Sequence, residues 1–141
     1  MHDQDAQAVI AALDLSPHPE GGWYRETWRA PAAQGERAAA SSILFLLEPG
    51  QRSHWHRVDA SELWLHHAGG ALILSLAGED GAIAQTRLGP DFAAGEALQA
   101  VVEAGLWQAA QALDRWVLVA CVVAPAFHFA GFDLAPPDWT P

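Results

Sequence analysis

Short runs of β-forming residues follow one another from Ser41 to Pro125, and they limit the fold more than any other feature of this sequence. The runs are SSILFLLEPG, SHWHRV, ELWLHHAGG, ALILSLAGEDG, AIAQTRLGP, LQAVVEAG, LWQAA and RWVLVACVVAP. Turn residues separate them at intervals of roughly ten residues, the spacing typical of an all-β sandwich or barrel. Helical periodicity is missing there. We therefore predict an all-β fold with a barrel over about residues 20–135.

The beginning of the chain has a different pattern. Ala6, Val9, Ile10 and Leu13 are spaced as on one face of a helix, and the pattern stops before Pro17. This predicts one short N-terminal helix over about residues 5–15. The sequence has 141 residues, of which 51% are hydrophobic and 17% charged. That length and composition favour one packed domain over residues 1–141.

The charge of the chain excludes several classes of partner. Seventeen acidic residues against seven basic ones give a formal charge of −10, which disfavours nucleic acid and anionic membrane surfaces. The N-terminal residues lack the pattern of a secretory signal, and the longest apolar run, Trp116 to Phe127, is too short to span a bilayer. We expect a cytoplasmic protein whose partner is a small molecule. The lone Cys121 reads as a small core residue.

The stretch SHWHRVDASELW contains the residues most suited to chemistry. In a regular strand, His54 and His56 point to the same face, and an antiparallel neighbour can bring Glu62 beside them. Two imidazoles and a carboxylate suit Fe(II), Mn, Ni or Zn. The same groups suit proton transfer, because histidine titrates near neutrality and burial raises the pKa of a glutamate. A polar seam facing solvent is the third interpretation, and the spacing does not decide among them.

Gly50, His54, His56, Glu62 and Gly69 resemble the first cupin motif, with a longer gap than usual between His56 and Glu62. In the second motif, Gln108 stands where the third histidine would be. A closer resemblance covers nearly the whole chain. HPEGGWYRETWR, SSILFLL, WHRVDASELW, VVEAGLWQAA and VACVVAPAFHFAGFDLA look like the small single-domain cupins of the "cupin 5" type, which are similar to nucleotide-sugar epimerases.

The resemblance implies a double-stranded β-helix, the cupin jelly roll, with one pocket in the barrel mouth and assembly into a homodimer. The residues it would bring to the pocket, as catalytic, substrate-binding or metal-binding groups, are Glu20, Tyr24, Arg25, Glu26, His56, Glu62, Trp64, Trp107, Gln108 and Phe127. His128, which replaces an aspartate of the family pattern, would substitute for the missing third histidine if it turned inward.

These observations lead to a small-molecule-binding protein, with an isomerase or epimerase acting on a polar, sugar-like or carbonyl compound as the leading hypothesis. His56 would be the base, Glu62 would orient it or share its proton, and Arg25 with Gln108 would bind the substrate's oxygens. A metal-dependent, oxygenase-like enzyme is the second hypothesis, with His54, His56 and Glu62 as ligands and Gln108 or His128 completing the set. A non-catalytic metabolite-binding module is the third.

Overall fold

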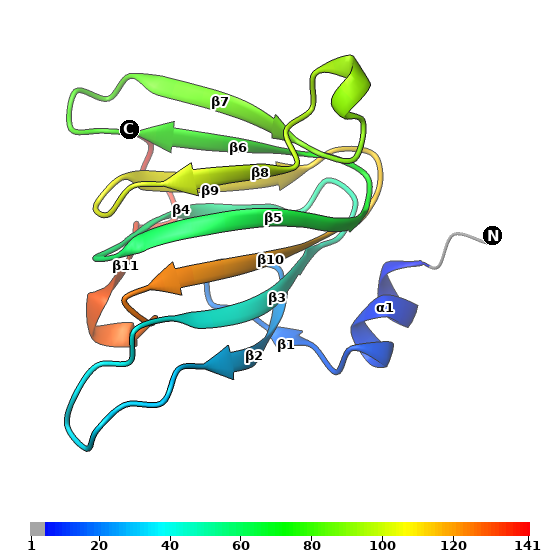
Figure 1. Ribbon diagram of the computed structural model, residues 1–141. Coiled ribbons are helices and arrows are strands. Elements are labelled where there is room, and N and C mark those ends of the chain that lie inside the picture. Colours follow the sequence, from blue (N-terminus) through cyan, green and yellow to red (C-terminus); the bar gives the residue numbers. More distant parts are fainter. Residues whose placement is uncertain (1–4) are drawn as a thin grey trace.

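The computed structural model describes residues 5–141, and it confirms an all-β jelly roll with one short helix (Figure 1). The helix α1 (Ala6–Ala12) is shorter than predicted. It begins where the Asp5 side chain accepts a hydrogen bond from the backbone N–H of Ala8, and it ends before Asp14, which has a left-handed backbone with φ of 55°. Residues 1–4, which the single-domain prediction includes, lie outside the described part of the chain.

The strands of the described chain form two antiparallel sheets. The six-stranded sheet has the order β1-β2-β3-β10-β5-β8 and the five-stranded sheet the order β11-β4-β9-β6-β7. The strand bounds are β1 (Ser16–Pro17), β2 (Trp23–Arg29), β3 (Ser41–Leu47), β4 (Arg52–Val58), β5 (Ser61–Gly69), β6 (Leu72–Ala77), β7 (Ile83–Leu88), β8 (Gln99–Val102), β9 (Trp107–Ala112), β10 (Val117–Ala124) and β11 (Phe132–Leu134). Two 3-10 turns, η1 (Phe92–Ala94) and η2 (Phe129–Gly131), complete the described elements.

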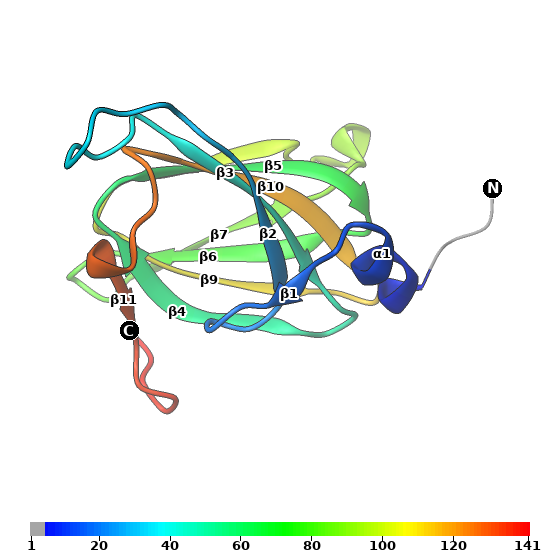
Figure 2. The same cartoon turned by 90° about the horizontal axis from the view of Figure 1, so that it is seen from below.

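The two sheets face each other and enclose the core, as the view from below shows (Figure 2). Alternation along each strand directs one set of side chains inward, and Phe45, Leu47, Trp64, Leu74 and Val119 are almost fully buried between the sheets. The aliphatic packing does not fill the whole space between the sheets. A smaller cluster lies outside the six-stranded sheet, where α1 covers Leu46 and Leu118.

The helices of the described residues do not include one that is long and apolar enough to cross a membrane.

Two glycines of the sequence motif occupy similar backbone conformations in different surroundings. Gly50 and Gly69 have φ of +74° and +84°. A Cβ on Gly50 would meet nothing within 4 Å, whereas one on Gly69 would overlap the carbonyl oxygen of Trp116. Both positions favour glycine for its backbone freedom, but only Gly69 also needs the absence of a side chain.

We expect Gly50→Ala to lower the free energy of unfolding by about 1 kcal/mol, the cost of a left-handed backbone. Gly69→Ala should lower it by roughly 3 kcal/mol or more, because overpacking adds to that cost. Chemical denaturation of both variants measures the difference. Equal losses in the two variants would contradict the close packing of Gly69 against the Trp116 carbonyl oxygen, just before β10.

Candidate functional site

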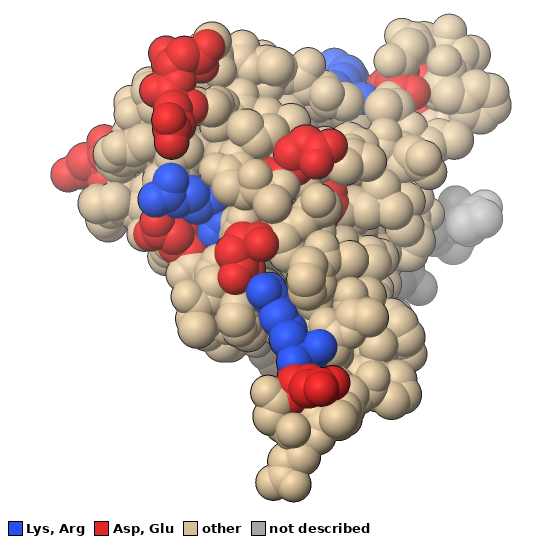
Figure 3. Space-filling model, turned by 60° about the vertical axis from the view of Figure 1, so that its left-hand side comes forward, with Lys and Arg blue, Asp and Glu red and all other residues tan. Residues whose placement is uncertain are grey.

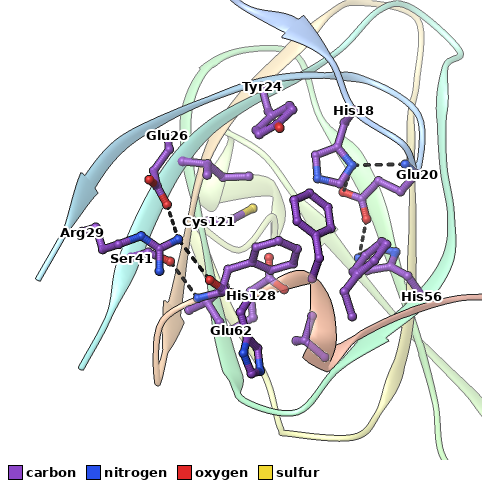
Figure 4. Close-up of a pocket in the computed structure, with 16 residues that line it drawn as sticks. His18, Glu20, Tyr24, Glu26, Arg29, Ser41, His56, Glu62, Cys121 and His128 are labelled. Atoms are coloured by element: carbon purple, nitrogen blue, oxygen red, sulfur yellow. Dashed lines mark hydrogen bonds and ion pairs between the residues drawn. The ribbon is translucent and has the colours of Figure 1, made fainter. Parts of the chain in front are cut away.

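A pocket of about 440 Å³ opens between the two sheets at one end of the barrel (Figure 4). Its buried lining groups that can carry or exchange a proton, here called the floor, are His18, Glu20, His56, Glu62 and Cys121. Its other lining residues are Tyr24, Glu26, Arg29, Ser41, Ile43, Val58, Val123, Phe127, His128, Phe129 and Phe132. The pocket therefore combines acid–base groups at its base with an aromatic and aliphatic wall.

Glu20 and His56 form a buried ion pair on the floor. His56 Nε2 lies 2.7 Å from Glu20 Oε2, with both side chains less than a tenth exposed. The other ring nitrogen, Nδ1, lies 2.7 Å from the backbone oxygen of His54. Both nitrogens thus face acceptors, which is the arrangement that satisfies a doubly protonated ring.

The charges of this pair shift both pKa values. Burial would lower the pKa of His56, but the charge of Glu20 and its hydrogen bond outweigh burial and raise it to about 9. Burial would raise the pKa of Glu20, but the His56 charge and hydrogen bond lower it below its ordinary value. At neutral pH the pair consists of an imidazolium and a carboxylate, with no net charge.

His18 is held beside the pair in its neutral form. The backbone N–H of Glu20 donates to His18 Nδ1 at 3.1 Å, so this nitrogen carries no proton, and its 3.7 Å approach to Glu20 Oε1 is not an ion pair. Burial lowers the pKa of His18, which favours the same neutral ring. The ring proton of the neutral form therefore lies on Nε2.

Glu62 is fixed from behind by two fully buried side chains. Trp64 Nε1 can only donate, and it donates to Gln108 Oε1 at 2.9 Å. This orients the amide so that Gln108 Nε2 donates to Glu62 Oε1, also at 2.9 Å. The Cys121 thiol donates to the same carboxyl group. Glu62 is thus prepared as a hydrogen-bond acceptor.

Burial raises the pKa of Glu62, and the nearby Glu20 charge adds to the increase, while the His56 charge and the bonds from Gln108 and Cys121 oppose it. Burial also raises the pKa of the Cys121 thiol well above its ordinary value, so this thiol stays protonated. The two floor glutamates consequently have pKa values shifted in opposite directions, the pattern of carboxyl groups with different chemical roles.

The prediction that His54 and His56 share a face is wrong, because β4 contains a bulge. Ser53 lies opposite Ala110 and His56 opposite Gln108, so three steps along β4 match two along β9. The extra residue turns both Ser53 and His56 inward and His54 outward, where its Nε2 lies 2.9 Å from the Pro136 carbonyl oxygen. Only His56 of the two histidines reaches the pocket.

Several other predicted residues lie outside the pocket. Arg25 is on the outer face of β2, between the pocket residues Tyr24 and Glu26, and its Nε donates to the Leu13 carbonyl oxygen. Trp107 packs on the outer side of β9 against Trp139, with ring centroids 4.5 Å apart. Alternation along each strand explains both placements. Trp64 and Gln108 lie in the core behind Glu62 and do not line the cavity.

The pocket rim contains ion pairs that sequence analysis did not find. Arg29 Nη2 lies 2.6 Å from Glu26 Oε1 and donates to the Phe127 carbonyl oxygen at 3.0 Å. His128 does not join His56, since its Nε2 lies 3.1 Å from Asp59 Oδ2. His18, which lines the pocket, is also absent from the predicted site residues. Its proximity to Glu20 in the motif HPEGG was the available signal.

These placements do not provide a ligand set for the Fe, Mn, Ni or Zn ion considered from the sequence. Within residues 5–141 there is no group of three His, Cys, Asp or Glu side chains arranged to hold a metal ion. His54 is turned away, Glu20 engages His56 Nε2, and the Gln108 amide is bonded on both sides. The donor set does not fit a metal centre.

Comparison with known proteins places the chain in a family. The family model described as cupin superfamily (DUF985) matches residues 7–135. The chain belongs to this cupin family. A crystal structure of a protein from Shewanella oneidensis is 39% identical, with a TM-score of 0.88, and the match covers 94% of this chain and 85% of that one. A hypothetical protein from Leishmania major is 30% identical, with a TM-score of 0.84 and coverage of 94% and 88%.

A more distant cupin with a named activity shares the fold alone. Oxalate decarboxylase from Bacillus subtilis is 18% identical to this cupin, with a TM-score of 0.66, and the match covers 84% of this chain and 29% of the decarboxylase. Mn(II) centres are described for that enzyme. A comparison with curated proteins finds no match. The family is therefore established, and its chemistry has to be argued from the pocket.

We expect Glu20→Gln to lower the pKa of His56 from about 9, because the opposing charge that outweighs burial is lost. NMR titration of the imidazole measures this pKa. Glu26→Gln is the control, because this rim residue contacts Arg29 and should leave the His56 pKa unchanged. A His56 pKa that stays near 9 in Glu20→Gln would contradict the assignment of its cause.

The Glu20–His56 ion pair should stabilise the fold most within a limited range of pH. The stabilisation from the raised His56 pKa is fully present below about pH 6.5 and is lost as the pH rises through about 9. The stabilisation from the lowered Glu20 pKa is present above pH 4.5 and is lost as the pH falls below it. The free energy of unfolding of the wild type relative to Glu20→Gln should therefore decrease on both sides of this range. A difference independent of pH would contradict the shifts.

The single cysteine allows the protonation of Glu62 to be read directly. We expect the infrared S–H stretching band of Cys121 to shift as Glu62 ionises, at a pH above 4.5. Gln108→Met should move this transition to higher pH, because it removes a donor that lowers the Glu62 pKa. Glu62→Gln should abolish it. A transition at an ordinary glutamate pKa in the wild type would contradict the effect of burial.

Proposed function

We propose that this cupin binds a small polar molecule in the pocket and catalyses an isomerisation by proton transfer. The observation that carries the proposal is the buried Glu62, held as an acceptor by Gln108 and Cys121, with a pKa that burial raises above its ordinary value. His18 Nε2–H supplies a neutral donor on the same floor. Base and donor are the two groups that enolisation of a carbonyl compound requires.

The geometry favours Glu62 as the base, in place of His56, which the sequence suggested. Both ring nitrogens of His56 face acceptors and its pKa is raised to about 9, so at neutral pH the ring has no free site to accept a proton. We assign the base to Glu62 and an electrostatic role to the Glu20–His56 pair. Trp64 and Gln108 are positioning residues, and Tyr24 and Phe127 belong to the wall that contacts the ligand.

The proposed step is balanced within the substrate and one side chain. The Glu62 carboxylate removes a proton from a carbon next to a carbonyl group, and the C–H electron pair becomes the C=C bond of the enolate. The carbonyl π electrons move to the oxygen, where the His18 N–H donates a hydrogen bond. When that carbon also has a hydroxyl group, the O–H proton passes to the former carbonyl oxygen and Glu62 returns its proton to the former carbonyl carbon, which gives the isomeric hydroxycarbonyl compound with no other reactant.

Glu62→Gln should reduce the reaction rate by about two to four orders of magnitude, the usual contribution of a general base. The assay is exchange of the carbon-bound protons of hydroxyacetone in D₂O, followed by NMR. His54→Gln is the matched control, since this neighbour in β4 faces away from the pocket and should keep wild-type exchange. Wild-type binding of hydroxyacetone without exchange would contradict the isomerase and leave a metabolite-binding protein. The homodimer and the cytoplasmic location stay predictions.

A further inference from the structure

The charged groups that line the pocket already have partners, and this limits what can bind there. The His56 cation lies 2.7 Å from the Glu20 carboxylate. At the rim, Arg29 is paired with Glu26 and His128 with Asp59. Figure 3 shows arginine and acidic side chains adjacent to one another on this side of the molecule, with no separate basic patch. Among the residues that the structure describes, an incoming anion meets no lining cation that lacks a carboxylate partner.

The floor has no net charge when Glu62 is protonated and a negative charge when Glu62 is ionised. The Glu20–His56 pair is neutral as a unit, and His18 is held neutral by the Glu20 backbone N–H. Glu62 contributes a carboxyl or a carboxylate, with its Oε1 already accepting from Gln108. A buried anionic group of a ligand would thus lose its hydration without gaining an unpaired cation, and this is strongly unfavourable.

The other lining groups of the pocket indicate which chemical group of a ligand fits there. His18 Nε2–H is a donor, and Glu62 is an acceptor or an exchangeable acid. Around them, Phe127, Phe129 and Phe132 form mutual edge contacts with centroids 5.0 to 6.2 Å apart, and Tyr24 packs against His18 at 4.6 Å. These rings provide an apolar wall for a planar ring or an aliphatic stem.

We propose that the pocket selects an uncharged carbonyl group on a ring or apolar stem, with the carbonyl oxygen accepting from His18, and that it discriminates against carboxylates. This selectivity proposal rests on the proposed function and names the substrate class for it. Any phosphate or carboxylate that the full substrate has then remains outside the floor. The selectivity contrasts with that implied by the name of the distant relative oxalate decarboxylase, whose substrate is a dicarboxylate.

Benzamide and benzoate test this selectivity, because they share size and shape and differ in charge. We expect benzoate to bind the wild type at least about tenfold more weakly than benzamide, as followed by protein NMR shifts of pocket residues. Glu26→Gln frees Arg29 at the exposed rim and should improve benzoate binding by up to about fivefold, without a change for benzamide. His54→Gln should leave both affinities unchanged.

Equal affinities for the two compounds, stronger binding of benzoate, or no binding of benzamide would overturn the proposed selectivity. Failure of the isomerase is distinguished by a separate readout. Acetophenone, which has the same ring and exchangeable protons beside its carbonyl, should bind like benzamide and exchange in D₂O. Selective binding of the neutral compounds with no exchange would sustain the selectivity and reject the proton transfer.

Discussion

The pocket depends on one buried ion pair, between Glu20 in the turn before β2 and His56 in β4. Burial of either charge alone would be strongly unfavourable, and each is accepted only because the other lies 2.7 Å away. The pair also connects the segment before β2, a strand of the six-stranded sheet, to β4 in the five-stranded sheet. It therefore fixes two sides of the pocket relative to each other while adding no net charge to the floor.

Neutrality of this pair gives Glu62 its distinct character. An unpaired His56 cation would strongly lower the Glu62 pKa, but the Glu20 charge acts in the opposite sense, so burial remains the largest effect. Gln108 then orients the carboxyl group without adding charge. A histidine at residue 108, as in the usual cupin motif, would bring a titratable ring or a metal ligand to the same place. The amide, fixed by Trp64, instead gives Glu62 an uncharged hydrogen-bond donor, which is compatible with the proposed proton transfer.

The sequence predicted the sheets and the inward position of His56 and Glu62, because periodic burial and family motifs are local patterns. It did not predict the bulge in β4, since an extra residue in a ladder depends on the partner strand β9 and leaves no mark in the residues SHWH. The outward position of Arg25 was within reach, because Tyr24 and Glu26 flank it and alternate residues share a face. The motif HPEGG was a signal for His18 but not for its tautomer, because a backbone N–H within the folded turn sets the tautomer.

The pairing of charge at the rim and on the floor also bears on how an acidic protein can select its ligand. A formal charge of −10 repels anions at long range, but salt screens that effect, and it cannot distinguish between a carbonyl and a carboxylate group within one molecule. Discrimination at that scale requires the local arrangement. Glu26 pairs with Arg29 and Glu20 pairs with His56, and the His18 N–H is an uncharged donor on the floor. The proposed specificity therefore depends on the pairing of the Arg29 and His56 cations with carboxylates as much as on the groups that contact the ligand.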